Sequence, residues 1–301
     1  MSKPTLSVII VNYNTLEYLS ACLVSLYNSS LPDSEFEVIV TDNASRENPA
    51  NVLKKKFPKV KILQNKTNTG FAKANNRGVK YCRGQYVLFL NPDTLVGKQT
   101  LRETVLFLEK NPQAAVVTAR VNLPDGSLDD ACHRGFPTPW NAFCHFSGLA
   151  ALFPRSTVFN GYHLGYRDLD KTHEIDSCVG AFMMVRKEAG GSAGWFDESY
   201  FWYGEDLDFC YRLKKNGWKI FFLPRVSIIH YKGVSSGLKK HTSHISTASR
   251  QTKIRASQAR YEVMRIFYRK HYNRGIYKWL SPLIFFGISI KERLSSYAHR
   301  F

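Results

Sequence analysis

The chain has 301 residues, of which 44% are hydrophobic and 22% are charged. These values exclude wholesale disorder, collagen and coiled coil, and the length allows one large domain or two modest ones. The formal net charge is +18, but residues 1–208 contain 22 basic and 22 acidic side chains, whereas residues 209–301 contain 20 basic and 2 acidic ones. A protein that coats nucleic acid would carry its basic residues more evenly, so nucleic acid is not an expected partner.

The first half of the chain alternates apolar runs with segments of helical spacing. Residues 6–11 are almost continuously apolar, which is typical of a parallel strand buried on both faces. Further strands are expected at residues 36–40, 60–63, 86–90 and 115–121. Helices are expected at residues 15–28, 49–57, 72–82 and 100–110. This rhythm predicts an α/β fold with a mostly parallel, Rossmann-like sheet that binds ligands beyond the carboxyl ends of its strands.

The second half is less regular. Residues 124–172 are rich in turn formers and aromatics, which predicts long loops and short helices. Residues 179–185 are apolar again, residues 206–215 have helical spacing, and two strands are expected at 218–223 and 226–230. The six cysteines form no C-x-x-C pair, which favours reduced cysteines in a cytoplasmic protein. The N-terminus lacks a signal-peptide pattern, and no apolar run reaches the roughly 20 residues of a spanning helix.

Polar side chains follow three of the predicted strands at their carboxyl ends. The first strand ends in Asn12-Tyr13-Asn14, the second in residues 41–45, which include Asp42 and Asn43, and the fourth in residues 91–93. Each cluster alone is explained equally well by turn chemistry. Together they favour one crevice, in which one carboxylate accepts a bond from a base and another holds a divalent cation against phosphates.

Eight motifs in order make the chain resemble glycosyltransferase family 2, with its GT-A fold, and within it the bacterial rhamnosyltransferase branch. Between residues 5 and 235 these motifs occupy residues 7–14, 40–45, 68–78, 89–93, 180–185, 194–197, 204–212 and 230–233. Each motif is weak alone, whereas the ordered set is specific. The resemblance implies a donor half at about 1–122, an acceptor half at about 123–235 and a basic helical C-terminal extension at 236–301.

The resemblance implies a nucleotide site over the strand ends. Asp42 would accept a hydrogen bond from the uracil or thymine ring. Gly70 would let the backbone approach the nucleotide closely, although an ordinary turn at the start of a helix also explains this glycine. The implied nucleotide-binding residues are Asn12, Tyr13, Asp42, Asn43, Gly70, Asn75, Asn76 and Asn91.

The resemblance also implies a metal site. Asp93 matches the final carboxylate of the family's Asp-x-Asp motif, whose first position is Asn91 here, so one anionic ligand is missing. His230 matches a histidine that completes the metal or diphosphate site in many relatives, although a lone histidine at a strand end is otherwise usually structural. Oxygen ligands and a diphosphate suit Mg²⁺ or Mn²⁺.

The Glu205-Asp206 pair is the expected catalytic centre. Inverting glycosyl transfer needs a base for the acceptor hydroxyl, and the resemblance assigns that role to Asp206. Glu205 would contact acceptor or donor sugar. The rings of Trp195 and Tyr203 are further candidates for stacking on sugar faces, although core packing explains most of the aromatic residues before this pair equally well. The alternative is that both carboxylates simply favour a helix N-terminus. Asp208, two residues further on, is expected to face away and to be structural.

The predicted function is transfer of a sugar, with L-rhamnose from dTDP-rhamnose as the first candidate, to a glycan or polyprenyl-diphosphate-linked acceptor in cell-surface polysaccharide synthesis. The alternatives are a UDP-hexose donor, a non-catalytic nucleotide-sugar-binding relative and a nucleotidyltransferase. The last would need a basic loop after the first strand, where Asn12-Tyr13-Asn14 stands.

The basic tail is expected to attach the protein peripherally to the inner face of an anionic membrane. Its basic residues are interleaved with the aromatic residues Tyr261, Phe267, Tyr268, Tyr272, Tyr277 and Trp279 and followed by an apolar patch at 283–286. Basic groups attract anionic headgroups, and aromatic rings settle at the interface. A merely solvated basic face is the alternative.

Overall fold

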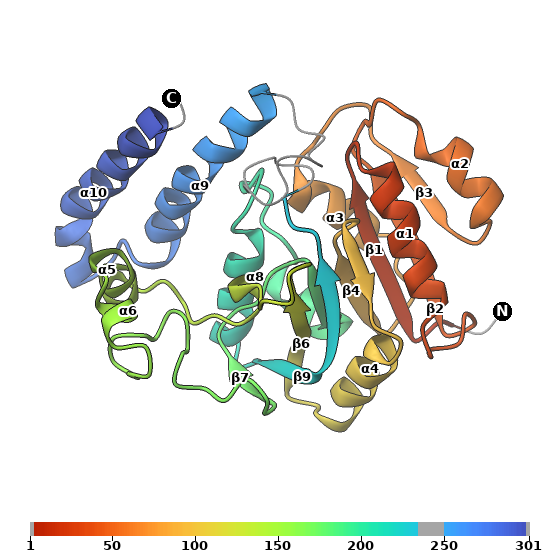
Figure 1. Ribbon diagram of the computed structural model, residues 1–301, viewed down its shortest axis with the longest axis horizontal. Coiled ribbons are helices and arrows are strands. Elements are labelled where there is room, and N and C mark those ends of the chain that lie inside the picture. Colours follow the sequence, from red (N-terminus) through yellow and green to blue (C-terminus); the bar gives the residue numbers. More distant parts are fainter. Residues whose placement is uncertain (1–2, 234–249, 299–301) are drawn as a thin grey trace.

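A computed structural model describes residues 3–233 and 250–298. One mixed sheet runs through it in the order β3-β2-β1-β4-β8-β6-β9-β5, and β7 pairs with β9 (Figure 1). The strands are β1 (Leu6–Asn12), β2 (Phe36–Asp42), β3 (Lys61–Gln64), β4 (Tyr86–Leu90), β5 (Thr94–Val96), β6 (Ala114–Asn122), β7 (His173–Ile175), β8 (Phe182–Arg186) and β9 (Lys219–His230).

The parallel half of the sheet confirms the expected α/β architecture. β1 is parallel to both β2 and β4, β2 is parallel to β3, and every residue of β1 is buried. Continuous apolar runs suit strands covered on both faces. The strand order reverses between β1 and β4, and crevices form at such a reversal, beyond the carboxyl ends of the strands.

Helices cover both faces of this sheet. The first set is α1 (Leu16–Tyr27), α2 (Pro49–Lys56), α3 (Phe71–Val79) and α4 (Thr100–Lys110), close to the expected bounds. Right-handed crossovers place α1 and α2 on one face and α3 on the other. Phe71 of α3, Phe196 and Phe209 pack together, which brings α8 (Glu205–Lys215) beside α3.

The second half departs from the sequence prediction in its strands. β8 is antiparallel to both neighbours, and the two strands expected at 218–223 and 226–230 are the single strand β9. Pairing with β6 jumps from Leu223 to Ser227, and Pro224 lies in the skipped stretch. Proline has no N–H to donate, so the ladder is interrupted there while the strand continues. The three-residue strands β5 and β7 were not predicted.

Short helices occupy the turn-rich stretch, as expected. They are η1 (Asp130–Cys132), α5 (Pro139–Ser147) and α6 (Leu149–Leu152), and α7 (Lys187–Ala193) follows β8.

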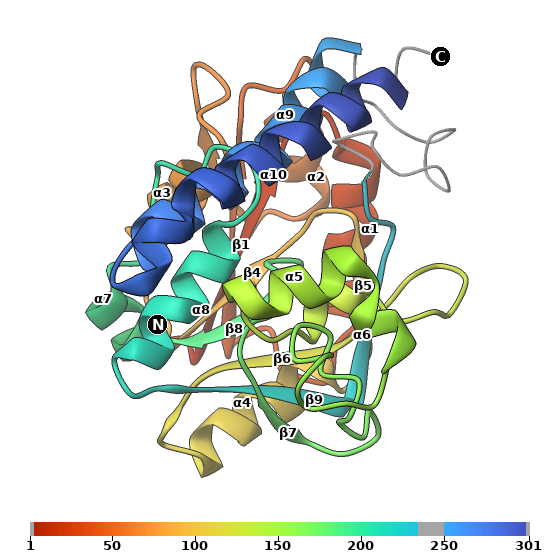
Figure 2. The same cartoon turned by 90° about the vertical axis from the view of Figure 1, so that its left-hand side faces the viewer.

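The C-terminal region is a helical hairpin of α9 (Arg250–His271) and α10 (Ile276–Ala298), which confirms the basic helical extension. The hairpin lies along one end of the molecule (Figure 2). The ring of Tyr211 on α8 lies 4.2 Å from that of His271 and 5.7 Å from that of Phe267 on α9. Residues 236–249 and 299–301 of the predicted extension lie outside the described residues. Within the described part, no helix is long and apolar enough to cross a membrane.

Candidate active site

The ends of β1 and β2 place Asn12 and Asp42 side by side. The two residues are paired in register, and Asn12 Nδ2 donates to Asp42 Oδ1 at 2.8 Å. Ser45 donates from Oγ to the same oxygen and from its amide to Oδ2. Both Asn12 and Asp42 are buried, so the Asp42 carboxylate is held in one orientation at the strand end.

Asn43 organises the loop that follows β3. Its Oδ1 accepts from the Thr69 amide at 3.0 Å, and its Nδ2 donates to Asn68 Oδ1 and to the Gly70 carbonyl. Gly70 directly precedes α3 with φ +85°, and a Cβ there would lie 2.7 Å from the carbonyl oxygen of Phe201. The close approach that requires glycine is therefore one between two protein segments.

Two of the predicted nucleotide residues use their side chains inside the protein. Asn75 is buried and donates to the Phe71 carbonyl. Asn76 donates to the Phe196 carbonyl at 2.8 Å and accepts from its amide at 3.2 Å. These contacts brace α3 against the segment before α8. Tyr13, beside Asn12, is half-buried.

A second cluster forms where the segment between β4 and β5 meets the end of β9. His230 Nε2 lies 3.4 Å from Asp93 Oδ1 and 3.3 Å from Asn91 Nδ2. The other ring nitrogen, Nδ1, lies 3.3 Å from Asp129 Oδ2, and Asp129 also pairs with Lys232. Thr94 is in register with His230, so the antiparallel β5–β9 ladder brings the two strand ends together.

Opposing effects act on the ionisation of His230. Burial lowers the pKa of His230, but the adjacent carboxylates of Asp93 and Asp129 outweigh it and raise the pKa to about 9. Burial raises the pKa of Asp129, but its bonds to His230 and Lys232 hold it well below the usual range.

The donor set suits a divalent cation. A buried carboxylate oxygen and an imidazole nitrogen converge at 3.4 Å, and Asp129 orients the ring from behind, as carboxylates commonly do for metal-binding histidines. Among the described residues no group of three His, Cys, Asp or Glu side chains is arranged to hold a metal. A cation held by Asp93 and His230 would need further ligands, which the oxygens of a bound diphosphate could supply.

The third cluster lies at the N-terminus of α8. Gly204, at φ +85°, precedes the helix, and Glu205 and Asp206 are 5% and 7% exposed. Asp206 Oδ2 lies 3.5 Å from Arg134 Nη2 and accepts from the Gly180 amide at 3.3 Å. Burial and the charge of Asp206 raise the pKa of Glu205 well above its usual range, and within the described residues Glu205 Oε2 has no hydrogen-bond partner.

Backbone contacts join the three clusters at one edge of the sheet. The Asn91 amide donates to the Ala181 carbonyl, one residue from Gly180, whose amide bonds Asp206. The Phe71 amide donates to the Phe201 carbonyl, which ties the loop held by Asn43 to the segment before α8. An oriented carboxylate, an Asp–His pair and a buried acidic pair are thus linked through the backbone at the carboxyl ends of the strands.

The family model for glycosyl transferase family 2 matches residues 7–189, which include Asn12 and Asp42 of the first cluster and Asp93 and Asp129 of the second. The chain belongs to this family. It is therefore a glycosyltransferase.

Relatives of this glycosyltransferase include two bacterial rhamnosyltransferases. It is 27% identical over 260 residues to N-acetylglucosaminyl-diphospho-decaprenol L-rhamnosyltransferase of Mycobacterium tuberculosis, covering 83% of each chain. It is 26% identical over 235 residues to rhamnosyltransferase WbbL of Escherichia coli, covering 74% of this chain and 82% of the relative. These relatives support the rhamnosyltransferase-like branch.

Solved structures confirm the GT-A-type fold. Residues 1–349 of S. aureus TarS in complex with UDP-GlcNAc align with a TM-score of 0.55 and 23% identity, over 87% of this chain and 65% of that one. Mannosyltransferase PcManGT of Pyrobaculum calidifontis in complex with GDP-Man and Mn²⁺ aligns with a TM-score of 0.58 and 17% identity, over 89% and 65%.

The two predicted aromatic contacts have different surroundings in this glycosyltransferase. The Trp195 ring packs between Gly190 of α7 and Phe209 of α8 and touches Phe89, so it supports the helix that carries Asp206. Tyr203, at φ +70°, is half-buried directly before Gly204, and its ring stacks on Trp202. Tyr203 adjoins the acidic pair, whereas the structure does not bring Trp195 to it.

Sequence reasoning missed Arg134 and Asp129. Both lie in the turn-rich stretch of the acceptor half, and their partners, Asp206 and His230, are 72 and 101 residues away. Chemical reasoning alone could have indicated them. A buried acidic pair requires a positive charge nearby, and a metal-binding histidine commonly has a carboxylate behind its ring.

Proposed function

We propose that the protein is a metal-dependent, inverting glycosyltransferase that transfers L-rhamnose from dTDP-rhamnose to a hydroxyl of a polyprenyl-diphosphate-linked saccharide in cell-surface polysaccharide synthesis. The observation that carries the proposal is the buried Glu205-Asp206 pair at the same sheet edge as Asp42 and Asp93. The donor and acceptor follow from the names of the two relatives, which are rhamnosyltransferases, one of them acting on a diphospho-decaprenol-linked sugar.

Asp42 is the proposed contact of the nucleotide base. Thymine and uracil both present an imide N–H, which a carboxylate accepts. Asn12 and Ser45 donate to Oδ1, and among the described residues Oδ2 accepts one bond, from the Ser45 amide, so it retains capacity for the base. This contact suits dTDP-rhamnose and a UDP-hexose equally, so the UDP-hexose donor remains the alternative.

Asp93 and His230 are the proposed metal ligands, with Asn91 beside them. The cation, Mg²⁺ or Mn²⁺, would neutralise the donor diphosphate and so stabilise it as a leaving group. Asp129 fixes the direction of the His230 ring.

Asp206 is the proposed general base. It takes the proton of the acceptor hydroxyl while the acceptor oxygen forms a bond to the anomeric carbon and the bond to the donor diphosphate breaks on the opposite side. Arg134 is buried and pairs with Asp206 at 3.5 Å, which helps to hold the carboxyl group of Asp206 in place. Glu205, kept protonated by burial, is suited to donate a hydrogen bond to a sugar hydroxyl.

The proposed place of action is the inner face of an anionic membrane, to which residues 209–301, with 20 basic and 2 acidic side chains, would be attracted. A lipid-linked acceptor would be presented there.

Asp206→Asn tests the function. We expect transfer from dTDP-rhamnose, assayed with Mg²⁺ or Mn²⁺, to fall by about 10²–10⁴-fold while donor binding measured by thermal shift persists, because only the proton acceptor is lost. Asp168→Asn, an exposed aspartate in the acceptor half, serves as the control. Turnover retained in Asp206→Asn would refute its role as base. Binding of dTDP-rhamnose without any transfer by the wild type would favour a non-catalytic relative.

A further inference from the structure

Five large apolar side chains form an exposed stripe along α10. They recur every three or four residues and therefore share one face of the helix: Trp279, Leu283, Phe286, Ile290 and Leu294. Trp279 is 86% exposed and Leu283 69%. The opposite face packs on α9, where Phe285 contacts the Tyr268 ring and Glu292 pairs with Arg265. The stripe therefore points away from α9.

The helices α5 and α6 extend this apolar surface. Residues 139–158, which include α5 and α6, expose six further large side chains: Trp140, Phe143, Phe146, Leu152, Phe153 and Val158. Lys291 of α10 lies with its ammonium 3.6 Å from the centre of the Phe146 ring, so the two groups adjoin. Figures 1 and 2 both draw α5, α6 and α10 at the same end of the molecule. We call these eleven side chains the apolar end face.

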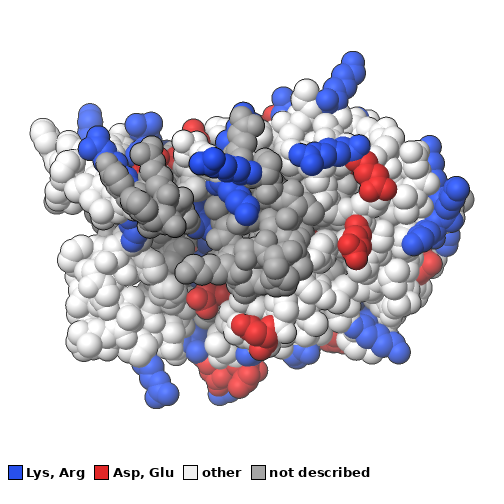
Figure 3. All heavy atoms as spheres, turned by 45° about the horizontal axis from the view of Figure 1, so that its top comes forward, with Lys and Arg blue, Asp and Glu red and all other residues white. Residues whose placement is uncertain are grey.

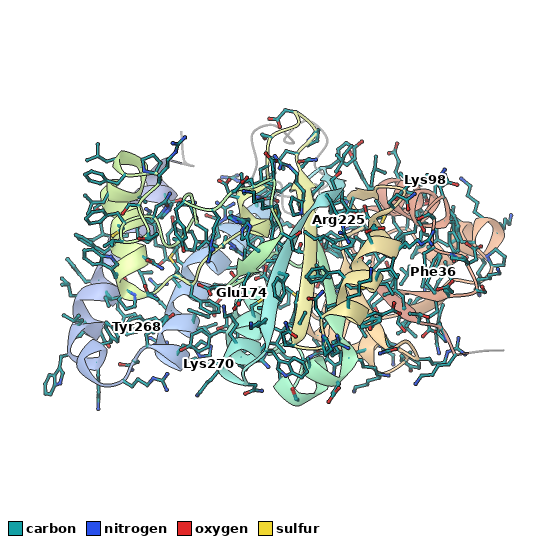
Figure 4. All side chains as sticks on the ribbon, turned by 90° about the horizontal axis from the view of Figure 1, so that it is seen from below. Phe36, Lys98, Glu174, Arg225, Tyr268 and Lys270 are labelled. Carbon is teal, nitrogen blue, oxygen red and sulfur yellow. The ribbon has the colours of Figure 1, made fainter. Side chains whose placement is uncertain are left out.

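The aromatic residues of α9 do not belong to this face. Tyr261, Phe267 and Tyr268, expected at a membrane interface, are each less than a tenth exposed. Phe267 packs against Tyr211 of α8, and Tyr268 turns toward α10, as Figure 4 shows. They hold the hairpin to the body of the protein. Of the six interleaved aromatics, Tyr277 and Trp279 are exposed.

Basic side chains border one side of the apolar end face. Residues 250–298 contain 11 Lys and Arg and only Glu262 and Glu292 as acidic residues. Figure 3 shows, at the left-hand end of the molecule, a broad area almost without charged side chains, with Lys and Arg above it. Apolar side chains with a basic border match a bilayer surface, in which apolar groups enter the acyl boundary and cations meet anionic headgroups.

We propose that the apolar end face inserts into the surface of an anionic lipid bilayer, so that α10 lies in the membrane plane with α5 and α6 beside it. A second copy of the chain is the competing occupant. A two-fold pair would bring the same basic border of both copies together, and like charges repel, whereas anionic lipid complements them. This inference deepens the proposed membrane location, because it assigns attachment to apolar insertion by two separate segments and not to tail charge alone.

The test measures binding of the full-length protein to vesicles of phosphatidylglycerol and phosphatidylcholine by sedimentation, in 0.1 M and 0.5 M NaCl. Two variants are compared with the wild type. The first carries Leu283→Gln and Phe286→Gln on α10, and the second carries Phe143→Gln on α5. We expect each to weaken binding about tenfold or more, since each loses buried apolar area without a change of charge. Val24→Gln, which alters a half-exposed apolar residue on α1, should bind like the wild type.

Two further measurements keep the result interpretable. Transfer to a water-soluble acceptor reports whether the variants are folded and active, so a failure of membrane binding is separated from a failure of the proposed function. Sedimentation velocity without vesicles reports association. Equal vesicle binding by wild type and variants would overturn the proposal. A wild-type dimer that ignores vesicles and dissociates in the Leu283→Gln/Phe286→Gln variant would also overturn it and assign the face to a second copy.

Discussion

Glu205 and Asp206 are neighbours in sequence and equally buried, yet their surroundings separate their roles. Asp206 pairs with Arg134 and accepts a hydrogen bond from the Gly180 amide. Glu205 has the charge of Asp206 beside it and no partner for Oε2 among the described residues, so burial and repulsion raise its pKa. Different surroundings commonly give neighbouring carboxyl groups different roles, one as base and the other as hydrogen-bond donor.

The raised pKa of Glu205 predicts a loss of stability with rising pH. A carboxyl whose pKa is higher in the folded state than its ordinary 4.5 favours folding when protonated, and this contribution disappears as pH rises through the raised pKa. Between pH 5 and 9, urea unfolding of the wild type should therefore show a falling free energy of unfolding. Glu205→Gln should reduce that fall, whereas Glu188→Gln, at an exposed site, should leave it unchanged. Identical pH profiles for wild type and Glu205→Gln would contradict the prediction.

Removal of the Asp93 carboxylate should weaken donor binding that depends on the metal. In Asp93→Ala, calorimetric binding of dTDP-rhamnose with Mn²⁺ should weaken by at least about tenfold, since one anionic ligand is removed. Binding in the presence of a chelator should be alike in both proteins. Asp130→Asn changes an exposed aspartate in the same loop as Asp129 and should have no effect. A donor affinity in Asp93→Ala that responds to Mn²⁺ as in the wild type would remove Asp93 from the metal site.

At the scale of elements, one turn of α8 carries two carboxylates with separate tasks. Asp206 and Asp208 are two residues apart and so point to opposite sides of the helix. Asp208 is fully buried and bonds Arg212, Lys270 and His271, each at 2.7 Å. Figure 4 shows Lys270 on the side of α9 that faces the body of the protein. A Cβ on Gly204 would collide with Val263 of α9, so α9 holds the turn that presents the acidic pair.

Asp208 predicts acid sensitivity of the contact between α8 and α9. Burial raises the pKa of Asp208, but His271, Lys270 and Arg212 outweigh it and lower the pKa to about 2. The contribution to stability is present above the ordinary 3.8 and is lost as pH falls toward 2. Asp208→Asn should cost about 3 kcal/mol at pH 7, because it removes the buried anion with which Arg212 and Lys270 pair, and much less near pH 2.

Asp197→Asn is the matched control for Asp208→Asn, because Asp197 pairs with the same Lys270 but is partly exposed. Its cost in urea unfolding should be about 1 kcal/mol or less. Equal costs for the two variants, or a cost for Asp208→Asn that does not shrink in acid, would show that the buried cluster does not hold α9.

At the scale of the molecule, the two helices of the hairpin are held differently. α9 packs on the body of the protein, and α10 packs on α9. α9 contacts α8 through Phe267, His271 and Lys270, whereas α10 packs mainly on α9. Stability is not uniform in such an arrangement, because an element opens locally when few buried contacts retain it.

Hydrogen exchange should report this division. We expect the backbone amides in the last three turns of α9 to be protected about as strongly as those of α8, and the amides of α10 to exchange faster in the absence of lipid. Addition of anionic vesicles should slow exchange in α10 and α5 and leave α1 unchanged. Exchange in α9 as fast as in α10 would contradict the proposed attachment of the hairpin.

The sequence identified most of the local chemistry. Buried apolar runs specify the strands, and polar residues directly after them marked Asn12, Asp42 and Asp93, because parallel strands end at one edge. The sequence-based predictions failed for residues whose contacts lie far away in the chain. Periodicity cannot distinguish an antiparallel β8 from a parallel strand, nor a helical aromatic that faces the core from one that faces solvent. Tyr261, Phe267 and Tyr268 were therefore misassigned to an interface.

The sequence by itself determined the fold class, the family and the position of the acidic pair, because these depend on local pattern and motif order. Tertiary structure alone decided what surrounds those groups: Arg134 beside Asp206, Asp129 behind His230, and α9 locked onto Asp208. It also joined α5 and α6 to α10 in one exposed apolar face. The reason is physical, since burial, electrostatic pairing and exposure depend on residues far apart in the chain, and only folding makes them neighbours.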